Sequence, residues 1–151
     1  NPDDYLNILN CGGNTALFDA AFNAVEVSNT YGDSLTKNDF SVNGIVFVVT
    51  DGEDNESTYG MDAVKQTIEK AVRGEMMESM VSILIGVSDN SRVMQALDDF
   101  NKVAGFTQFI NIGEASDKKL AKLAQFVSKS ISSQSTSLGT KSGSQPINFT
   151  F

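Results

Sequence analysis

The sequence predicts an α/β fold in which a mainly parallel sheet lies between two layers of helices. Two short apolar runs rich in β-branched residues, 45–50 and 81–87, are bounded by turn residues. Such runs are typical of strands buried on both faces, which belong to parallel sheets covered by helices. Segments with apolar residues at helical spacing alternate with these runs, and this alternation favours right-handed crossovers between parallel strands.

The first helical pattern follows a glycine-containing turn at residues 11–14. We expect Asn14 or Thr15 to cap this helix, with Asp19 near the positive end of its dipole. Residues 31–43 are polar and contain a glycine, so they predict a connection to the strand at 45–50. The inward stripe of the helix consists of Leu17, Ala21, Ala24, Val25 and Ser28.

An acidic loop at residues 53–59 separates the first strand from a second amphipathic helix. The apolar stripe of this helix ends near Gly74, which favours a C-cap there. The stripe is formed by Met61, Val64, Ile68, Ala71 and Val72.

The same alternation continues after the second strand. A loop and cap at 88–91 lead into a third helix, which Gly105 ends. A shorter strand at 107–112 follows, and Ser116 and Asp117 cap a fourth helix. The stripes of these two helices are Val93, Leu97, Phe100 and Ala104, and then Leu120, Leu123, Ala124, Val127 and Ile131.

The composition fits one globular domain and narrows the classes of partner. A chain of 151 residues with 40% hydrophobic residues can bury a core. The patterns predict a domain at 1–134 and a flexible Ser/Gly-rich tail at 135–151. A formal net charge of −8 argues against nucleic acid as a partner and favours cations. No apolar run is long enough to cross a bilayer, so we expect no membrane partner and a soluble cytoplasmic or virion protein.

The side-chain inventory limits any bound metal to oxygen ligands. Cys11 is the single cysteine and His is absent, which excludes an internal disulfide and His-bearing zinc sites. The absence of His also excludes a His-activated nucleophile. We interpret Cys11 as a small buried hydrophobic residue rather than a reactive thiol.

Two segments carry oxygen ligands that the predicted topology brings together. The sequence GNTALFDA at 13–20 opens the first helix, and VTDGEDN at 49–55 ends the first strand. In open α/β sheets ligands bind at the carboxyl ends of strands, where the Thr15 hydroxyl and the Asp51 carboxylate can converge. Mg²⁺ accepts hydroxyl, carboxylate and water oxygens, and Mn²⁺ or Ca²⁺ could substitute. The alternative is that Asp51 and Asp54 only shape a turn and cap the next helix.

In this order and spacing, the two segments resemble the second and third motifs of the metal-ion-dependent adhesion site of von Willebrand factor A-type (VWA) domains. The resemblance covers residues 9–131 and implies a three-layer Rossmann-like fold. It implies that Thr15 is a direct metal ligand, that Asp51 is an acidic ligand often acting through water, and that Gly52 lets the turn pass close to the ion. The residues that would face a partner near the ion are Asn14, Gly52, Glu53 and Asp54.

The first motif of that family, DxSxS at the tip of the first central strand, has no match in this sequence. The resemblance therefore implies a VWA-type fold that is incomplete in this chain and lacks the ligands of that motif. Two ligands alone do not hold Mg²⁺ against water. The strand at 45–50 would also keep an open apolar edge, which invites pairing. We expect an upstream segment or a second chain to complete the sheet.

The resemblance implies a non-enzymatic module that binds another protein, whose acidic side chain completes the coordination of the ion. One alternative is a structural scaffold component of a larger assembly, such as a phage particle, with a vestigial metal site. A second is a Mg²⁺-dependent phosphatase in which Asp51 is the nucleophile and Asp54 assists. Against an enzyme stand the lack of a Lys or Arg clamp near that loop, the absence of His, and the absence of a phosphate-binding glycine loop.

Overall fold

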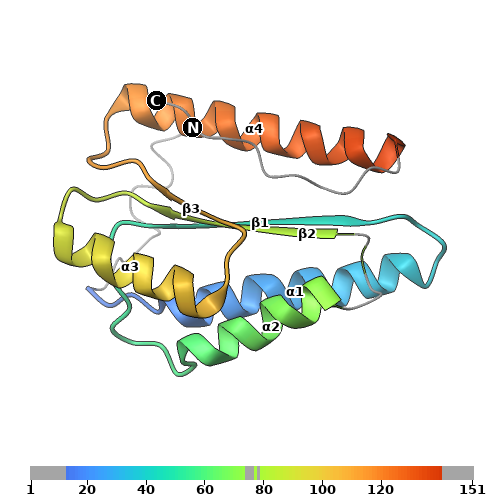
Figure 1. The fold of residues 1–151 in the computed structure, drawn as a ribbon, viewed down its shortest axis with the longest axis horizontal. Helices are drawn as coiled ribbons and strands as arrows, with labels where there is room; N and C mark the ends of the chain where they lie inside the picture. The colour runs from blue at the N-terminus through green and yellow to red at the C-terminus, as the bar shows by residue number, and fades with distance from the viewer. Residues whose placement is uncertain (1–12, 74–76, 78, 141–151) are drawn as a thin grey trace, which may run out of the picture.

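The computed structural model describes residues 13–73, 77 and 79–140. Cys11, Gly74 and residues 141–151 of the predicted tail lie outside the described residues. The described elements alternate between helix and strand, as Figure 1 shows. In chain order they are α1 (Leu17–Thr36), β1 (Asn43–Thr50), α2 (Met61–Arg73), β2 (Ser79–Gly86), α3 (Ser91–Ala104), β3 (Gln108–Asn111) and α4 (Asp117–Thr140).

The sheet lies between two layers of helices. Its strand order is β1-β2-β3, and both pairs of strands are parallel. Helices α1, α2 and α3 cover one face of the sheet, and α4 covers the other (Figure 1). The predicted α/β class with a parallel sheet is therefore confirmed, and the arrangement is compatible with a Rossmann-like fold. None of the helices in the described part of the chain has the length and apolarity that crossing a bilayer requires.

The three strands end in one row, which we call the crest. Thr50 of β1 is in register with Gly86 of β2, and Gly86 is in register with Asn111 of β3. A hydrogen bond from Val87 N to Thr50 O at 2.8 Å continues the pairing past the strand ends. The crest therefore consists of strand carboxyl ends, where sheets of this type bind ligands.

β2 is the buried centre of the sheet. Residues 80–86 are all buried. Side chains alternate between the two faces of a strand, so Leu84 packs with α1, α2 and α3, while Ile83 and Ile85 pack with α4. The predicted burial on both faces is confirmed for this strand.

β1 is an edge strand and is covered less completely. Val46 and Val48 are buried on the α1 side, whereas Phe47 is half-buried and Val49 is 53% exposed on the α4 side. The prediction that the strand at 45–50 is buried on both faces is therefore wrong for β1. The reason is the missing neighbour, since no described strand pairs with the outer side of β1.

α1 is longer than the sequence predicts. It continues through residues 31–36, for which the polar composition predicts a connection. Asn29 and Gly32 are buried and continue the inward stripe at helical spacing. The polar residues of this turn lie on the exposed side, so they do not end the helix.

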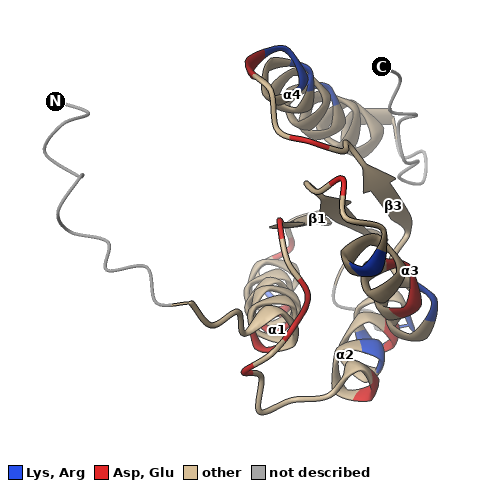
Figure 2. Cartoon of the chain, turned by 90° about the vertical axis from the view of Figure 1, so that its left-hand side faces the viewer, with Lys and Arg blue, Asp and Glu red and all other residues tan. Residues whose placement is uncertain are grey.

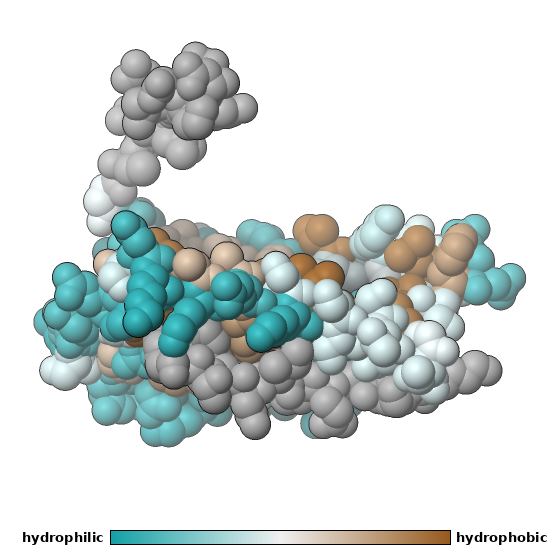
Figure 3. All heavy atoms as spheres, turned by 90° about the horizontal axis from the view of Figure 1, so that it is seen from above, coloured by the Kyte–Doolittle hydropathy of each residue, from teal (hydrophilic) through white to brown (hydrophobic). Residues whose placement is uncertain are grey.

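α4 also runs past its predicted end, through residues 135–140. Hydroxyl groups in this Ser/Thr-rich stretch donate to carbonyl oxygens one turn earlier, as Thr136 does to Ser132 O at 2.9 Å. These hydroxyls therefore form hydrogen bonds within the helix, although in the sequence the same Ser and Thr residues indicate a flexible segment. Figure 3 looks onto α4 and shows strongly hydrophilic residues over its first half and weakly polar ones over its second half.

Candidate metal and partner-binding site

Thr50 shapes the turn that follows β1. Its buried hydroxyl accepts a hydrogen bond from Gly52 N at 3.2 Å and donates to Gly52 O at 2.9 Å. Asp51 between them is exposed and makes no hydrogen bond or ion pair with another described residue. The alternative in which Asp51 itself shapes the turn does not match these bonds. The carboxylate of Asp51 is instead available to a ligand at the crest.

Thr15 lies beside this turn. Its Oγ1 is 4.0 Å from the position that a Cβ atom on Gly52 would occupy. The structure thus brings together the two segments that were expected to converge, the start of the first helix and the end of β1. A Cβ atom at that distance would make an ordinary van der Waals contact, so the close passage expected of Gly52 stays a prediction.

Thr15 is also held through its backbone by the loop between β1 and α2. Thr15 N donates to Asn55 Oδ1 at 2.7 Å, and Asn55 N donates to Thr15 O at 3.0 Å. These are two of a set of hydrogen bonds between residues 14–19 and 54–59, which we call the clasp. The clasp joins segments about forty residues apart in the sequence, so local motifs did not predict it.

The clasp also caps α1. The N-cap residue of this helix is Ala16, which makes no side-chain cap bond, so the prediction that Asn14 or Thr15 caps the helix is wrong. Instead, Phe18 N donates to Asp54 Oδ1 at 3.2 Å. The carboxylate thus satisfies one of the N–H groups that a helix start leaves unpaired.

Asp19 ties the loop to α1 in both directions. Its backbone N donates to Ser57 Oγ at 3.0 Å, and its carboxylate accepts from Thr58 N at 3.1 Å and Tyr59 N at 2.8 Å. The ring of Tyr59 stacks on Phe22 with the centroids 4.2 Å apart. Asp19 lies in the first turn of α1 as predicted, and its role as a backbone acceptor for the loop is an addition to that prediction.

Two of the residues predicted to face a partner are engaged at the surface. Asn14 Nδ2 donates to Glu56 Oε2 at 3.0 Å. Glu53 pairs with Arg92 of α3 at 3.3 Å, and an exposed pair of this kind contributes little to stability. The fold thus brings a basic side chain to a loop for which the sequence predicted none. Both pairs can open at low cost if a partner approaches.

The third predicted contact residue, Asp54, is engaged inside the clasp. In addition to the bond from Phe18 N, its carboxylate accepts from the Ser57 hydroxyl and from Ser57 N at 3.4 Å. Asp54 therefore holds the loop in place, and the fourth residue, Gly52, offers only its backbone.

The electrostatic character of this region is acidic. Figure 2 marks several Asp and Glu positions along the loop that connects β1 to α2, whereas the Lys and Arg positions lie mostly on the helices. A loop lined by one sign of charge favours ligands of the other sign, so the crest near β1 favours cations.

The oxygen atoms of Thr15 and Asp51 fit part of the coordination shell of Mg²⁺. They are a hydroxyl and a carboxylate, which are hard ligands of the type this ion prefers. In the described part of the chain no group of three or more His, Cys, Asp or Glu side chains could hold a metal ion. The remaining ligands would have to be water or groups supplied from outside the described residues.

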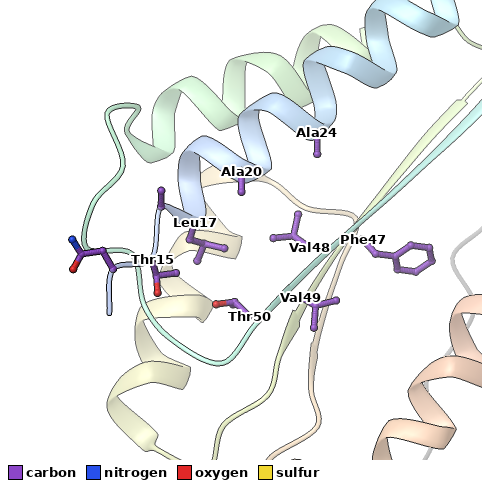
Figure 4. Close-up of a pocket in the computed structure, with 10 residues that line it drawn as sticks. Thr15, Leu17, Ala20, Ala24, Phe47, Val48, Val49 and Thr50 are labelled. Atoms are coloured by element: carbon purple, nitrogen blue, oxygen red, sulfur yellow. The ribbon is translucent and has the colours of Figure 1, made fainter. Parts of the chain in front are cut away.

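A pocket of about 470 Å³ runs from Thr15 along the outer side of β1. We call it the edge groove and define it by residues 14–17, Ala20, Ala24 and 47–50. Figure 4 shows Thr15 at one end of the edge groove and Phe47 at the other. The small side chains of α1 leave this space open beside the unpaired side of β1.

Comparison of the chain with family models, curated proteins and solved structures found no match. Fold and site geometry are therefore the basis on which a function is inferred.

Proposed function

We propose that this chain is a non-enzymatic protein-binding module of the VWA type, which recognises its partner through a divalent cation at the crest. One observation carries the proposal: the Thr15 hydroxyl lies 4.0 Å from where a Cβ atom on Gly52 would be, in the turn that bears Asp51, and the Asp51 carboxylate makes no bond with another described residue. The parallel α/β fold supports the proposal at the level of fold class, because the turn that bears Asp51 follows the carboxyl end of a parallel strand.

In this proposal Thr15 and Asp51 supply two of the ligands of Mg²⁺, with Mn²⁺ or Ca²⁺ as substitutes. Two protein ligands leave most of an octahedral shell to water, to a partner's Glu or Asp, and to groups outside the described residues. The bound ion supplies the positive charge that lets an acidic side chain approach an acidic crest.

The proposal includes a strand that completes the sheet beside β1. The outer side of β1 presents backbone groups that no described strand pairs with, and the edge groove lies next to them. An apolar edge strand of eight residues is a template for pairing. The added strand comes from an upstream segment or a second chain, and its end at the crest would lie near Thr15.

A structural scaffold without a functional metal is the second candidate. The observation that favours it is the lack of a three-ligand cluster among the described side chains. A scaffold would use the edge groove and the open side of β1 for assembly and would not need Asp51. The two candidates therefore differ in whether Asp51 matters.

A phosphatase that uses Asp51 as nucleophile is less well supported. Such a mechanism needs a second group to assist proton transfer, and Asp54 was the expected one. The carboxylate of Asp54 is engaged by Phe18 N and by Ser57, which supports a structural role in the clasp.

Paramagnetic Mn²⁺ tests the proposal, because it broadens nearby amide resonances even when binding is weak. Titrated into the ¹⁵N-labelled full chain, Mn²⁺ should broaden the amide signals of Thr15 and Asp51 first. Asp51→Ala should abolish this selectivity, since it removes the only charged ligand of the proposed pair.

Asp89→Ala is the matched control. Asp89 is another exposed aspartate, and it lies in the loop after β2. This variant should leave the broadening at Thr15 unchanged. If Mn²⁺ broadens all acidic loops equally, or if Asp51→Ala has no effect, the metal-bridged proposal is wrong and the scaffold takes its place.

A further inference from the structure

Asn55 holds both backbone polar groups of Thr15. Its side-chain Oδ1 accepts from Thr15 N at 2.7 Å, and its own N donates to Thr15 O at 3.0 Å. A single residue thus fixes the backbone that carries the proposed hydroxyl ligand. This residue is three positions after Gly52, so the same loop that bears Asp51 also orients Thr15.

The position of Thr15 depends on these two hydrogen bonds, because Thr15 is not part of α1. The helix starts at Leu17, and the N-cap Ala16 has φ −93° and ψ 63°, outside the helical region. Regular helical hydrogen bonding therefore does not set the position of Thr15. Its orientation relative to Asp51 follows from the pair of bonds to Asn55.

Apart from the bond from Asn14 Nδ2 to Glu56, the other bonds of the clasp attach one turn further along the chain. They join the loop to Phe18 N and to Asp19, with Asp54 and Ser57 as acceptors. These bonds do not involve Thr15 and remain possible when Asn55 is replaced. Loss of the Asn55 side chain should therefore release Thr15 locally while the loop stays attached to α1.

We infer that Asn55 is a positioning residue of the crest site, which sets the Thr15 hydroxyl in the place where it and Asp51 bind one cation. The inference rests on the proposed function and adds to it a residue that the two ligand motifs did not single out. Groups that orient metal ligands change metal affinity about 10–100-fold when removed, although they never touch the ion.

Asn55→Ala and Asn55→Asp test the inference in the full chain. Asn55→Ala removes the acceptor, so amide hydrogen exchange at Thr15 should accelerate by about tenfold, the usual effect of losing one such bond. The Mn²⁺ affinity measured by titration should fall by about tenfold. Asn55→Asp keeps an acceptor oxygen and should restore the slow exchange at Thr15, with Mn²⁺ affinity no weaker than that of the wild type.

Asn90→Ala is the matched control, because Asn90 Oδ1 accepts from Arg92 N at 2.9 Å at the start of α3. Asn90→Ala should lower the global stability by an amount similar to that lost in Asn55→Ala. It should leave the amide exchange rate of Thr15 and the Mn²⁺ affinity unchanged. A control that weakens Mn²⁺ equally would show that the effect is general destabilisation, which overturns the inference.

The possible failures are distinguishable. If Thr15 exchange is unchanged in Asn55→Ala, or if it accelerates without any loss of Mn²⁺ affinity, the inference is wrong and the proposed function stands. If the wild-type chain shows no selective Mn²⁺ response at Thr15 and Asp51, the proposed function fails, and the role of Asn55 at a metal site fails with it.

Discussion

β1 and β2 are strands of equal length and similar apolar composition, yet the sheet covers them very differently. Each has eight residues. In β2 every residue from 80 to 86 is buried, whereas in β1 Val49 remains 53% exposed. The two strands pair with each other over their full length, so the difference arises on the other sides. β2 has β3 beside it, and β1 has no described neighbour.

This difference in exposure shows that β1 has the composition of a strand with two neighbours. A half-exposed edge strand usually carries charged residues or proline, which discourage pairing with other chains. The run from Ile45 to Val49 has neither. The edge groove lies along this side of β1, which supports the proposal that a further strand completes the sheet.

Leu84→Ala should have the largest effect, because Leu84 is fully buried in the central strand. We expect a loss of about 2–5 kcal/mol in the free energy of unfolding, from the lost apolar contact and the cavity left behind. Urea denaturation followed by circular dichroism measures it. Val49→Ala, on the exposed side of β1, is the control and should cost less than about 0.5 kcal/mol. Equal losses would mean that another strand covers Val49 in solution.

The loops after the two strands differ in a similar way. The loop after β1 is joined to α1 by side-chain hydrogen bonds, whereas the Asn90 side chain in the loop after β2 caps the helix that follows it. Asp54→Ala should therefore cost about 1–2 kcal/mol of stability, the usual value for losing a helix cap. Thermal unfolding measures this. Glu53→Ala removes only an exposed ion pair and should change stability by less than about 0.5 kcal/mol. A larger effect at Glu53 than at Asp54 would contradict the clasp.

Val49→Lys tests the open side of β1 directly. We expect the wild-type chain to self-associate as its concentration rises, because an apolar edge pairs readily. A lysine at this exposed position should reduce the association while changing stability by less than about 0.5 kcal/mol. Light scattering coupled to size-exclusion chromatography would report the mass, which should approach the 16.2 kDa of one chain. If the variant and the wild type have the same mass at every concentration, the open edge does not drive assembly.

The sequence predicted the parts of this molecule that depend on periodicity. β2 and most of the inward stripes of α1, α2 and α3 follow from apolar spacing, and the approach of Thr15 to the turn after β1 follows from the parallel topology. The stripe predicted for α4 is wrong, because Leu120, Ala124 and Ile131 are exposed. The buried residues of this helix are Leu123, Phe126, Ser130 and Gln134. Burial of β1 was predicted incorrectly because composition reports the neighbours a strand is suited to, whereas exposure depends on the neighbours it has.

Features that depend on distant partners could not be predicted in the same way. The bond between Thr15 N and Asn55 joins residues forty positions apart, and neither residue carries a local signal for the other. Arg92 reaches Glu53 only because α3 starts beside the loop. The helical state of residues 135–140 was missed because Ser and Thr indicate flexibility until their hydroxyls find carbonyl partners within the helix.

The smallest predicted effect concerns the side of α1 that faces α2, away from the open edge. Glu26 accepts a hydrogen bond from the Thr67 hydroxyl and lies 3.3 Å from Lys70 Nζ. The bond from Thr67 is the main cause that lowers the pKa of Glu26, with a smaller contribution from Lys70. A carboxylate with a lowered pKa in the folded state stabilises the fold above its ordinary pKa of 4.5, and this contribution is lost as the pH falls through the lowered value.

Thr67→Val should therefore destabilise the protein more at pH 7 than at pH 3. The pH-dependent part should be less than about 1 kcal/mol, because the carboxylate is partly exposed to solvent. Urea denaturation at both pH values measures it. Val27→Ala is the control. Val27 is adjacent to Glu26 in the sequence but faces outward, and the effect of this variant should not change with pH because no charge is involved. Thr67→Val could instead lower the free energy of unfolding by the same amount at both pH values. That result would show that Thr67 stabilises the fold by packing alone and does not favour the charged form of Glu26.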